Sequence, residues 1–119
     1  MSTKALHNKS IKSLPRARLL EMVTDIFRVL GDATRLKILY ALQKGEMCVK
    51  DLADLSGISQ SGVSHQLSHM RKLKFVKVRK DGNTAFYSLR YKHLAAILKE
   101  AEYYAEHIKR NLPDHPYTY

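Results

Sequence analysis

The sequence predicts a mostly α-helical chain that carries one β-hairpin, an α+β class in which helices dominate. Three observations predict this class. Apolar residues recur at three- and four-residue spacing in five segments, and two of these segments are joined by a short turn that contains glycine. An Asp-Gly-Asn turn also lies between two strand-like stretches. At 119 residues the chain has the length of a single domain.

Two helices are expected between Pro15 and Gly45. Proline suits the first turn of a helix, and the apolar residues that follow Pro15 lead to Gly31, a typical helix end. Asp32 can cap the second helix, which ends at Gly45. Residues 1–14 show no sustained period, so they are expected to form a flexible N-terminal arm.

The next two helices are predicted to form a helix-turn-helix. The first is short and closes at Gly57, whereas Ser59 can cap a second helix that runs to about Lys74. Only three residues lie between the last apolar residue of the short helix and Ser59, so the turn is tight. The apolar residues that predict the short helix are Val49, Leu52 and Leu55.

A hairpin and a long helix complete the predicted domain. In "FVKVRKDGNTAFYSLR" the turn Asp81-Gly82-Asn83 separates two β-prone stretches, as expected of two strands joined by a tight loop. An apolar stripe then predicts a helix from about Tyr91 to Asn111, before a C-terminal tail at 112–119. Residues 15–111 therefore predict a winged helix-turn-helix domain.

The charge of the chain indicates a polyanionic partner. Lys and Arg number 21 against 11 Asp and Glu, which gives a net charge of +10 and a pI near 9.8. Solubility alone is the other interpretation. The single cysteine, Cys48, cannot form an internal disulfide, and neither a signal sequence nor an apolar run of about 20 residues is seen. A cytoplasmic protein with no membrane partner is therefore expected.

The stretch "SQSGVSHQL" is almost free of charge, although basic residues surround it. On the 59–74 helix the apolar residues Val63, Leu67 and Met70 fall on one side, which predicts a polar opposite side. Short neutral donors and acceptors suit base edges in a major groove, whereas an ordinary solvated face is the alternative. The candidate base contacts are Gln60, Ser61, Ser64, His65, Gln66 and Ser68. The candidate contacts to the DNA backbone or minor groove are Lys72, Arg79, Lys80 and Asn83.

Several motifs of the sequence resemble those of the ArsR/SmtB family of bacterial metal-sensing repressors. The likeness runs from about Val23 to His107, and its most specific pieces are "LGDATRLKIL", "SQSGVSHQL" and "KVRKDGNTAFYSL". The resemblance implies a homodimer through the first and last helices, with recognition helices in successive major grooves of double-stranded operator DNA. It also implies that metal binding releases the DNA, and Zn²⁺, Ni²⁺, Co²⁺ and Cd²⁺ are the candidate ions.

Two metal sites follow from the resemblance. The first uses Cys48 and Asp51, which match the family's Cys and Asp in "CVKDL". A thiolate and a carboxylate suit Zn²⁺, but a four-coordinate site needs more ligands, for which His7 in the arm is a candidate. A buried, inert cysteine is the alternative interpretation of Cys48.

The second metal site lies on the last helix. The family's ligand positions are occupied here by Tyr91, His93, Tyr104 and His107, of which the two histidines are usual ligands. Fourteen residues separate the histidines, roughly 21 Å along a helix, so an antiparallel partner helix would have to bring them together. Histidines packed at an interface are the alternative. Further candidate ligands are Glu100, Glu106 and His115.

The sequence therefore predicts a sequence-specific DNA-binding repressor that a metal ion releases from its operator. The alternatives are a member of the family that has lost metal sensing and responds to oxidation of Cys48 or to another signal, or a nonspecific nucleic-acid-binding module. An enzyme is disfavoured, because the adjacent Ser64 and His65 point in different directions on a helix and a third residue to orient them is missing.

Overall fold

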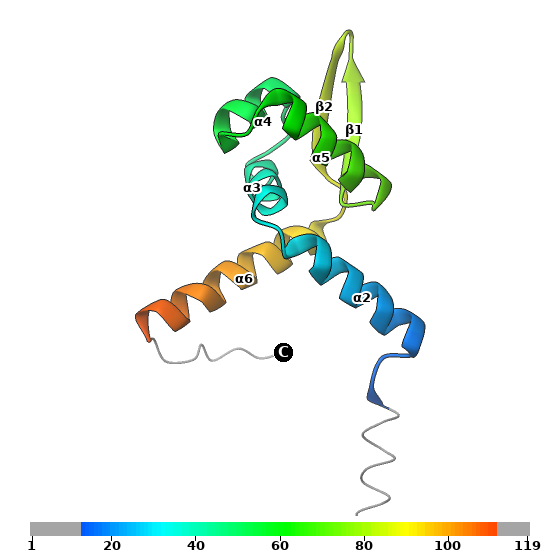
Figure 1. Cartoon of the computed structure of the whole chain (residues 1–119), viewed down its shortest axis with the longest axis vertical. Helices are drawn as coiled ribbons and strands as arrows, with labels where there is room; N and C mark the ends of the chain where they lie inside the picture. The colour runs from blue at the N-terminus through cyan, green and yellow to red at the C-terminus, as the bar shows by residue number, and fades with distance from the viewer. Residues whose placement is uncertain (1–12, 112–119) are drawn as a thin grey trace, which may run out of the picture. The chain divides into compact units, whose positions relative to one another are not determined.

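The computed structural model describes residues 13–111, and its helices and strands follow the predicted order (Figure 1). The predicted C-terminal tail and all but Ser13 and Leu14 of the predicted arm lie outside the described residues. The chain divides into two compact units, and the boundary in the sequence falls between Leu36 and Lys37. Among the described residues, none of the helices has the length and apolar character needed to cross a bilayer.

The first unit consists of helix α2 (Ala17–Leu30) and the start of α3 (Ala33–Leu42). The Asp32 carboxylate accepts a hydrogen bond from the backbone N–H of Arg35 at 2.9 Å, so the predicted cap is confirmed. Arg35 Nε also donates to the Val29 carbonyl at 3.0 Å, which fixes the turn between the helices. Several large apolar side chains of α2 remain exposed, namely Leu19, Leu20, Met22 and Phe27.

The second unit holds the rest of α3 together with α4 (Val49–Ser56), α5 (Gln60–Lys72), β1 (Val76–Asp81), β2 (Thr84–Leu89) and α6 (Lys92–Arg110). Its core draws side chains from each of these elements except β2. Burying each of the Val, Leu, Ile, Phe and Met side chains of this core contributes roughly 1.5–3 kcal/mol. The larger side chains that are almost completely buried are Ile38, Leu39, Leu52, Val63, Leu67, Met70, Val76 and Leu98.

The turn between α4 and α5 has the predicted helix-turn-helix form. Gly57 adopts a left-handed conformation with φ of 73°, which ends α4. The Ser59 hydroxyl accepts a hydrogen bond from the backbone N–H of Gly62 at 3.1 Å and so caps α5 as predicted. The buried residues of α4 are Leu52 and Ala53, whereas Leu55 is 52% exposed.

Helix α5 ends at Lys72, two residues before the expected end. Lys74 adopts a left-handed conformation with φ of 64°, and the Phe75 N–H donates to the Met70 carbonyl at 2.9 Å. The Lys74 N–H donates to the Arg71 carbonyl, which completes a Schellman motif without glycine. This motif turns the chain directly from α5 into β1.

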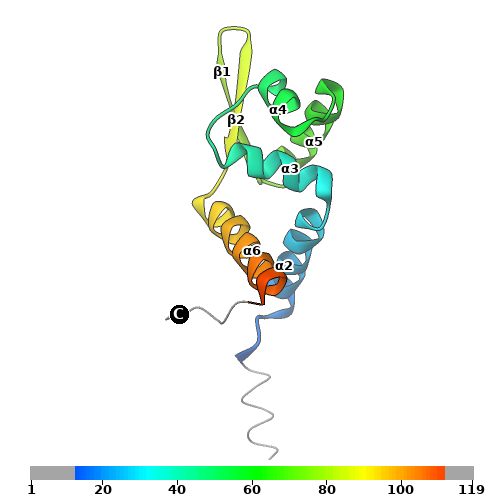
Figure 2. The ribbon, with the colours of Figure 1, turned by 90° about the vertical axis from the view of Figure 1, so that its left-hand side faces the viewer.

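The predicted hairpin is confirmed, and an additional segment extends it. Strands β1 and β2 pair in register from Val76↔Leu89 to Asp81↔Thr84, which leaves Gly82 and Asn83 as the turn. Met47, which lies between α3 and α4, exchanges two backbone hydrogen bonds with Tyr87 of β2 at 3.0 and 2.8 Å. Both ribbon views show the tip of the hairpin extending beyond α4 and α5 (Figures 1 and 2).

Helix α6 packs through its first half and is joined to α3 by polar contacts. Leu94 and Leu98 are its buried residues. The Tyr40 hydroxyl donates to the Leu98 carbonyl at 2.7 Å, and Gln43 Nε2 donates to the Ala95 carbonyl at 2.9 Å. Burial, and secondarily the Glu102 carboxylate, raises the pKa of Tyr40. The large apolar side chains that stay exposed on α6 are Ile97, Tyr103, Tyr104 and Ile108.

Candidate nucleic-acid interface

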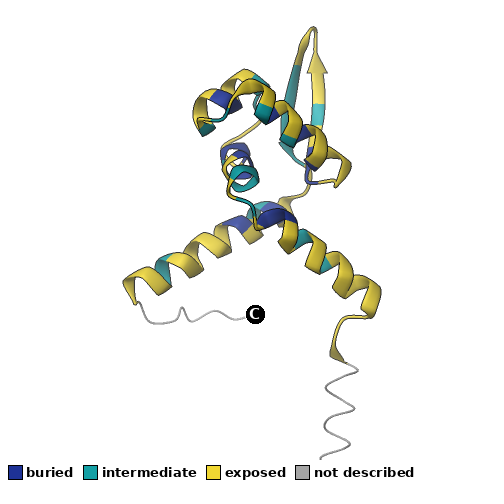
Figure 3. Ribbon diagram, in the orientation of Figure 1, coloured by how far each residue is buried: buried dark blue, intermediate teal, exposed yellow. Residues whose placement is uncertain are grey.

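The orientation of α5 is fixed by its apolar side. Val63, Leu67 and Met70 are each 0% exposed, so this side of the helix is completely covered by the rest of the unit. The opposite side is therefore turned toward solvent (Figure 3). Ser61, His65 and Ser68 lie opposite the apolar side, and Gln60 and Ser64 flank them near the start of the helix. These five candidate base contacts are all exposed, and we call them the outward face of α5. His69, in the last turn of α5, is exposed as well.

Gln66 and Gly62 of α5 are less available to a ligand than the outward face. Gln66 is half-buried at the margin of the apolar side, so less of it is available to a ligand than of the outward face. Gly62 has an internal role, because a Cβ atom there would lie 3.0 Å from both Ile58 Cγ2 and Ser59 Oγ. Glycine at this position therefore leaves room for the Ser59 cap.

The basic candidates lie at the end of α5 and on the hairpin. Lys72 is exposed in the last turn of α5, and Asn83 is exposed in the hairpin turn. Arg79 and Lys80 are consecutive residues of β1, so their side chains lie on opposite faces of the hairpin.

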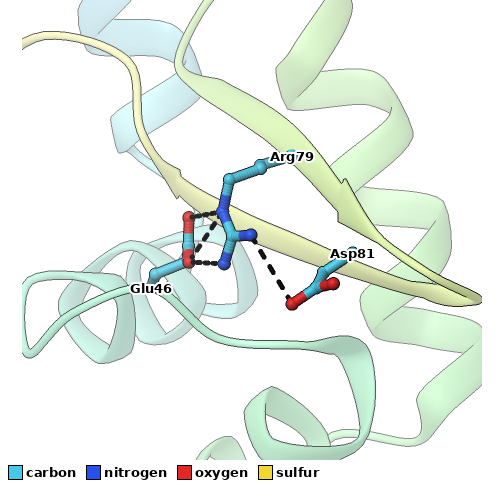
Figure 4. Close-up of polar contacts among 3 residues, drawn as sticks. All are labelled: Glu46, Arg79 and Asp81. Atoms are coloured by element: carbon cyan, nitrogen blue, oxygen red, sulfur yellow. Dashed lines mark hydrogen bonds and ion pairs between the residues drawn. The ribbon is translucent and has the colours of Figure 1, made fainter.

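Arg79 forms an ion pair with Glu46 of the same chain (Figure 4). Its Nη2 atom donates to Glu46 Oε1 at 2.6 Å, and its Nε atom lies 3.2 Å from each Glu46 carboxylate oxygen. The guanidinium also lies 5.0 Å from the centre of the Phe86 ring and 3.9 Å from the Asp81 carboxylate. The hydrogen bond from Arg79 lowers the pKa of Glu46. Glu46 is 33 residues away in sequence and was missed by sequence reasoning.

The Cys48 and Asp51 candidates occupy the start of α4. Cys48 is the N-cap residue of α4 and is a free, half-buried thiol, whereas Asp51 is exposed in the first helical turn. Within residues 13–111, no three side chains of the metal-binding types His, Cys, Asp and Glu gather at one place. The described part of one chain therefore does not complete a metal site. His7 and His115 lie outside the described residues.

The histidine candidates lie near opposite ends of α6. His93 is exposed in the first turn, and His107 is half-buried in the last turns. His107 Nδ1 lies 2.7 Å from the Tyr103 carbonyl, and a carbonyl oxygen can only accept, so Nδ1 carries the proton. Nε2 is then the nitrogen with the chemistry of a metal ligand in neutral His107.

Tyr91, at a family ligand position, interacts with its neighbour Arg90. Arg90 Nε lies 3.3 Å from the Tyr91 hydroxyl, and the guanidinium lies 5.4 Å from the centre of the ring. The hydrogen bond and the positive charge of Arg90 lower the pKa of the phenol. Tyr104, at the other such position, is 72% exposed.

The sequence is similar to one family model and to several bacterial transcriptional regulators. Residues 32–78 match the model of the "Bacterial regulatory protein, arsR family". The chain is 37% identical to the HTH-type transcriptional regulator KmtR of Mycobacterium tuberculosis over 79% of this chain and 72% of KmtR. It is 41% identical to NmtR of the same organism over 79% of both chains. It is also 35% identical to a homologue of the cadmium resistance regulatory protein CadC from Staphylococcus aureus, over 79% of this chain and 78% of the relative.

Solved structures show the same fold. The solution structure of apo-NmtR is 35% identical, covers 89% of both chains and superimposes with a TM-score of 0.72. A homodimeric winged helix-turn-helix DNA-binding domain from Mycobacterium bovis is 23% identical, covers 87% of this chain and 97% of its own, and has a TM-score of 0.74.

Proposed function

The chain belongs to the arsR family of bacterial regulatory proteins, and from that membership we propose that it is a homodimeric repressor that reads its operator through α5. Proteins of this family are DNA-binding transcriptional regulators, and the relatives named above are regulators rather than enzymes. We further propose that the repressor acts in the bacterial cytoplasm, where operator DNA is found, and that a metal ion lowers its affinity for that DNA.

The observation that carries the proposal is the outward face of α5. An exposed row of serine, glutamine and histidine side chains offers hydrogen-bond donors and acceptors without net charge, which suits base edges. Lys72 at the end of α5 and Lys80 on the hairpin supply positive charge for phosphates beside these bases. The net charge of +10 favours the same partner.

The homodimer is supported by apolar side chains that the chain leaves in water. α2 and α6 each carry a row of large exposed apolar residues, including Phe27 at 61% and Ile108 at 69% exposure. Several large apolar side chains exposed on one helix are typical of protein interfaces. In such a dimer the two α5 helices would contact half-sites about one helical turn of DNA apart, roughly 10 base pairs.

The metal proposal depends on a second copy of the chain. His93 and His107 are too far apart on one helix to share an ion, so we propose that His93 of one protomer and His107 of its partner contribute to one site. Cys48 and Asp51 are the second candidate set and need further ligands. A bound divalent ion would supply positive charge and fixed geometry at the dimer interface. The relative named for cadmium resistance supports metal responsiveness in the family.

Selection of binding sites from a pool of random DNA duplexes tests the proposed function. We expect enrichment of an inverted repeat, because a two-fold dimer presents two equivalent α5 helices. Binding to the enriched duplex should weaken steeply with salt and should exceed binding to an unrelated duplex of equal length by about a thousandfold or more. Equal affinity for both duplexes would instead favour the nonspecific nucleic-acid-binding module.

Titration with metal ions tests the proposed response. Adding Zn²⁺, Ni²⁺, Co²⁺ or Cd²⁺ to the protein bound to its selected duplex should lower the affinity roughly tenfold for at least one ion. Anisotropy of a labelled duplex measures this change. Loss of the response in His93→Ala alone would assign the α6 site, whereas loss in Cys48→Ser, together with loss of thiolate charge-transfer absorption, would assign the α4 site.

If none of the four metal ions changes the affinity, the metal proposal fails. Treatment with peroxide then tests the thiol alternative. A change in DNA affinity that occurs in the parent protein and is absent in Cys48→Ser would show that the chain responds to oxidation of the cysteine.

A further inference from the structure

Three contacts tie the hairpin to the segment that leads into α4. Met47 exchanges two backbone hydrogen bonds with Tyr87, and the adjacent Glu46 binds Arg79 of β1 through both carboxylate oxygens. Cys48, the next residue, begins α4 as its N-cap. We call the Glu46 and Arg79 pair the hairpin clamp. Figure 4 shows the two residues facing one another, with Arg79 on β1 and Glu46 on the segment before α4. β1 is paired along its whole length with β2.

The clamp makes Arg79 a poor phosphate contact. Two of its nitrogens are committed to Glu46, and a third lies 3.9 Å from Asp81 Oδ2. Two carboxylates therefore surround one guanidinium, and a DNA phosphate that approached it would meet their negative charge. The Phe86 ring stacks against the guanidinium and further restricts its motion.

The planar guanidinium also explains why arginine suits this position. A bidentate pair fixes both the distance and the relative orientation of its partners, whereas a lysine ammonium would fix only a distance. One end of the clamp is on the segment before α4, and the other is on the strand that leads to the hairpin turn. The clamp therefore connects the hairpin to the segment before α4 at a second point, beside the backbone pairing of Met47 with Tyr87.

We propose that Arg79 is a positioning residue that acts through Glu46 to orient the hairpin toward DNA, rather than a residue that binds phosphate itself. This inference rests on the proposed DNA-binding function. Phosphate contact from the hairpin then falls to groups such as Lys80, which lies on the opposite face of β1. Glu46, an acidic residue in a DNA-binding protein, thereby contributes to DNA affinity.

Four variants of the full chain test the proposal: Glu46→Gln, Arg79→Gln, the double variant, and Lys80→Gln as a control that removes charge from the same strand. Affinities for the selected duplex are measured over a salt series. Loss of either clamp residue should weaken binding about two- to fivefold, the range that a partly exposed ion pair supports. The double variant should be no weaker than the weaker single variant, because both changes break one interaction.

The salt dependence separates positioning from phosphate binding. Arg79→Gln and Glu46→Gln should keep the slope of log affinity against log salt, whereas Lys80→Gln should lower its magnitude by about 0.9. Exchange of the Tyr87 amide hydrogen, which donates to Met47, should become faster in both clamp variants and remain unchanged in Lys80→Gln.

Several results would overturn the proposal. One is a Glu46→Gln variant that binds the selected duplex as tightly as the parent, or more tightly. Simple removal of a negative charge predicts that result. A slope reduced by about 0.9 in Arg79→Gln is another, as are additive losses in the double variant. Unchanged exchange of the Tyr87 amide hydrogen in both clamp variants would by itself refute the clamp. If the parent protein shows no preference between the two duplexes, the proposed DNA-binding function fails instead.

Discussion

Replacing Ile108 with glutamate is expected to convert the protein into a monomer and to weaken operator binding about a hundredfold or more. Ile108 is 69% exposed on α6 and lies one helical turn from Tyr104, which is 72% exposed. A carboxylate at this position would be removed from water in the dimer without a partner of opposite charge, which is costly. Sedimentation and DNA titration measure the two effects. The loss is large because each half-site alone binds weakly.

The matched control is Lys109→Glu, which places the same carboxylate one residue away on a different face of α6. This variant should remain a dimer. Because Ile108 is exposed in the single chain, Ile108→Glu should leave helix content close to that of the parent by circular dichroism. A dimeric Ile108→Glu protein with unchanged operator affinity would remove α6 from the proposed interface.

Sequence reasoning succeeded where the signal lies within a few residues of its effect. Asp32 and Ser59 each cap a helix through a backbone N–H three residues ahead, and Gly57 ends α4 in a left-handed conformation. The hairpin follows from Gly82, whose φ of 62° suits a two-residue turn. These interactions depend on local backbone geometry, which the order of residues determines directly.

The features that sequence reasoning missed have two different causes, one a distant contact and one a local conformation. Glu46 and Arg79 are 33 residues apart and meet only because Met47 pairs with β2. The early end of α5 depends on Lys74 in a left-handed conformation, which lysine seldom adopts. Glycine is the usual residue at such a position, and without it the sequence gives no signal for the end of the helix.

The exposed face of α5 could be predicted from the sequence because it follows from local periodicity. The periodicity that buries Val63, Leu67 and Met70 also determines which residues of α5 face solvent. The two candidate metal sites could not be predicted in this way. Within residues 13–111 of one chain, neither candidate set gathers three side chains of the metal-binding types at one place. No pattern within one sequence specifies which residues of a second copy come within bonding distance.

Replacing Ser64 and His65 together with alanine is expected to reduce sequence preference about ten- to a hundredfold. Both residues lie on the exposed outward face of α5, and a well-placed side-chain contact to a base is worth about 1–3 kcal/mol of discrimination. Affinity for an unrelated duplex and the salt slope should stay close to those of the parent, because neither residue has the permanent positive charge of a lysine or an arginine. The ratio of the two affinities, measured at one salt concentration, gives the result.

Lys72→Gln is the matched control, since Lys72 is exposed on the same helix and carries charge. It should weaken binding to both duplexes alike and lower the magnitude of the salt slope by about 0.9. Alanine favours helix more than serine or histidine does, so a loss of preference in Ser64→Ala/His65→Ala cannot arise from a weaker α5. An unchanged affinity ratio in that variant would mean that α5 does not read bases through these two side chains.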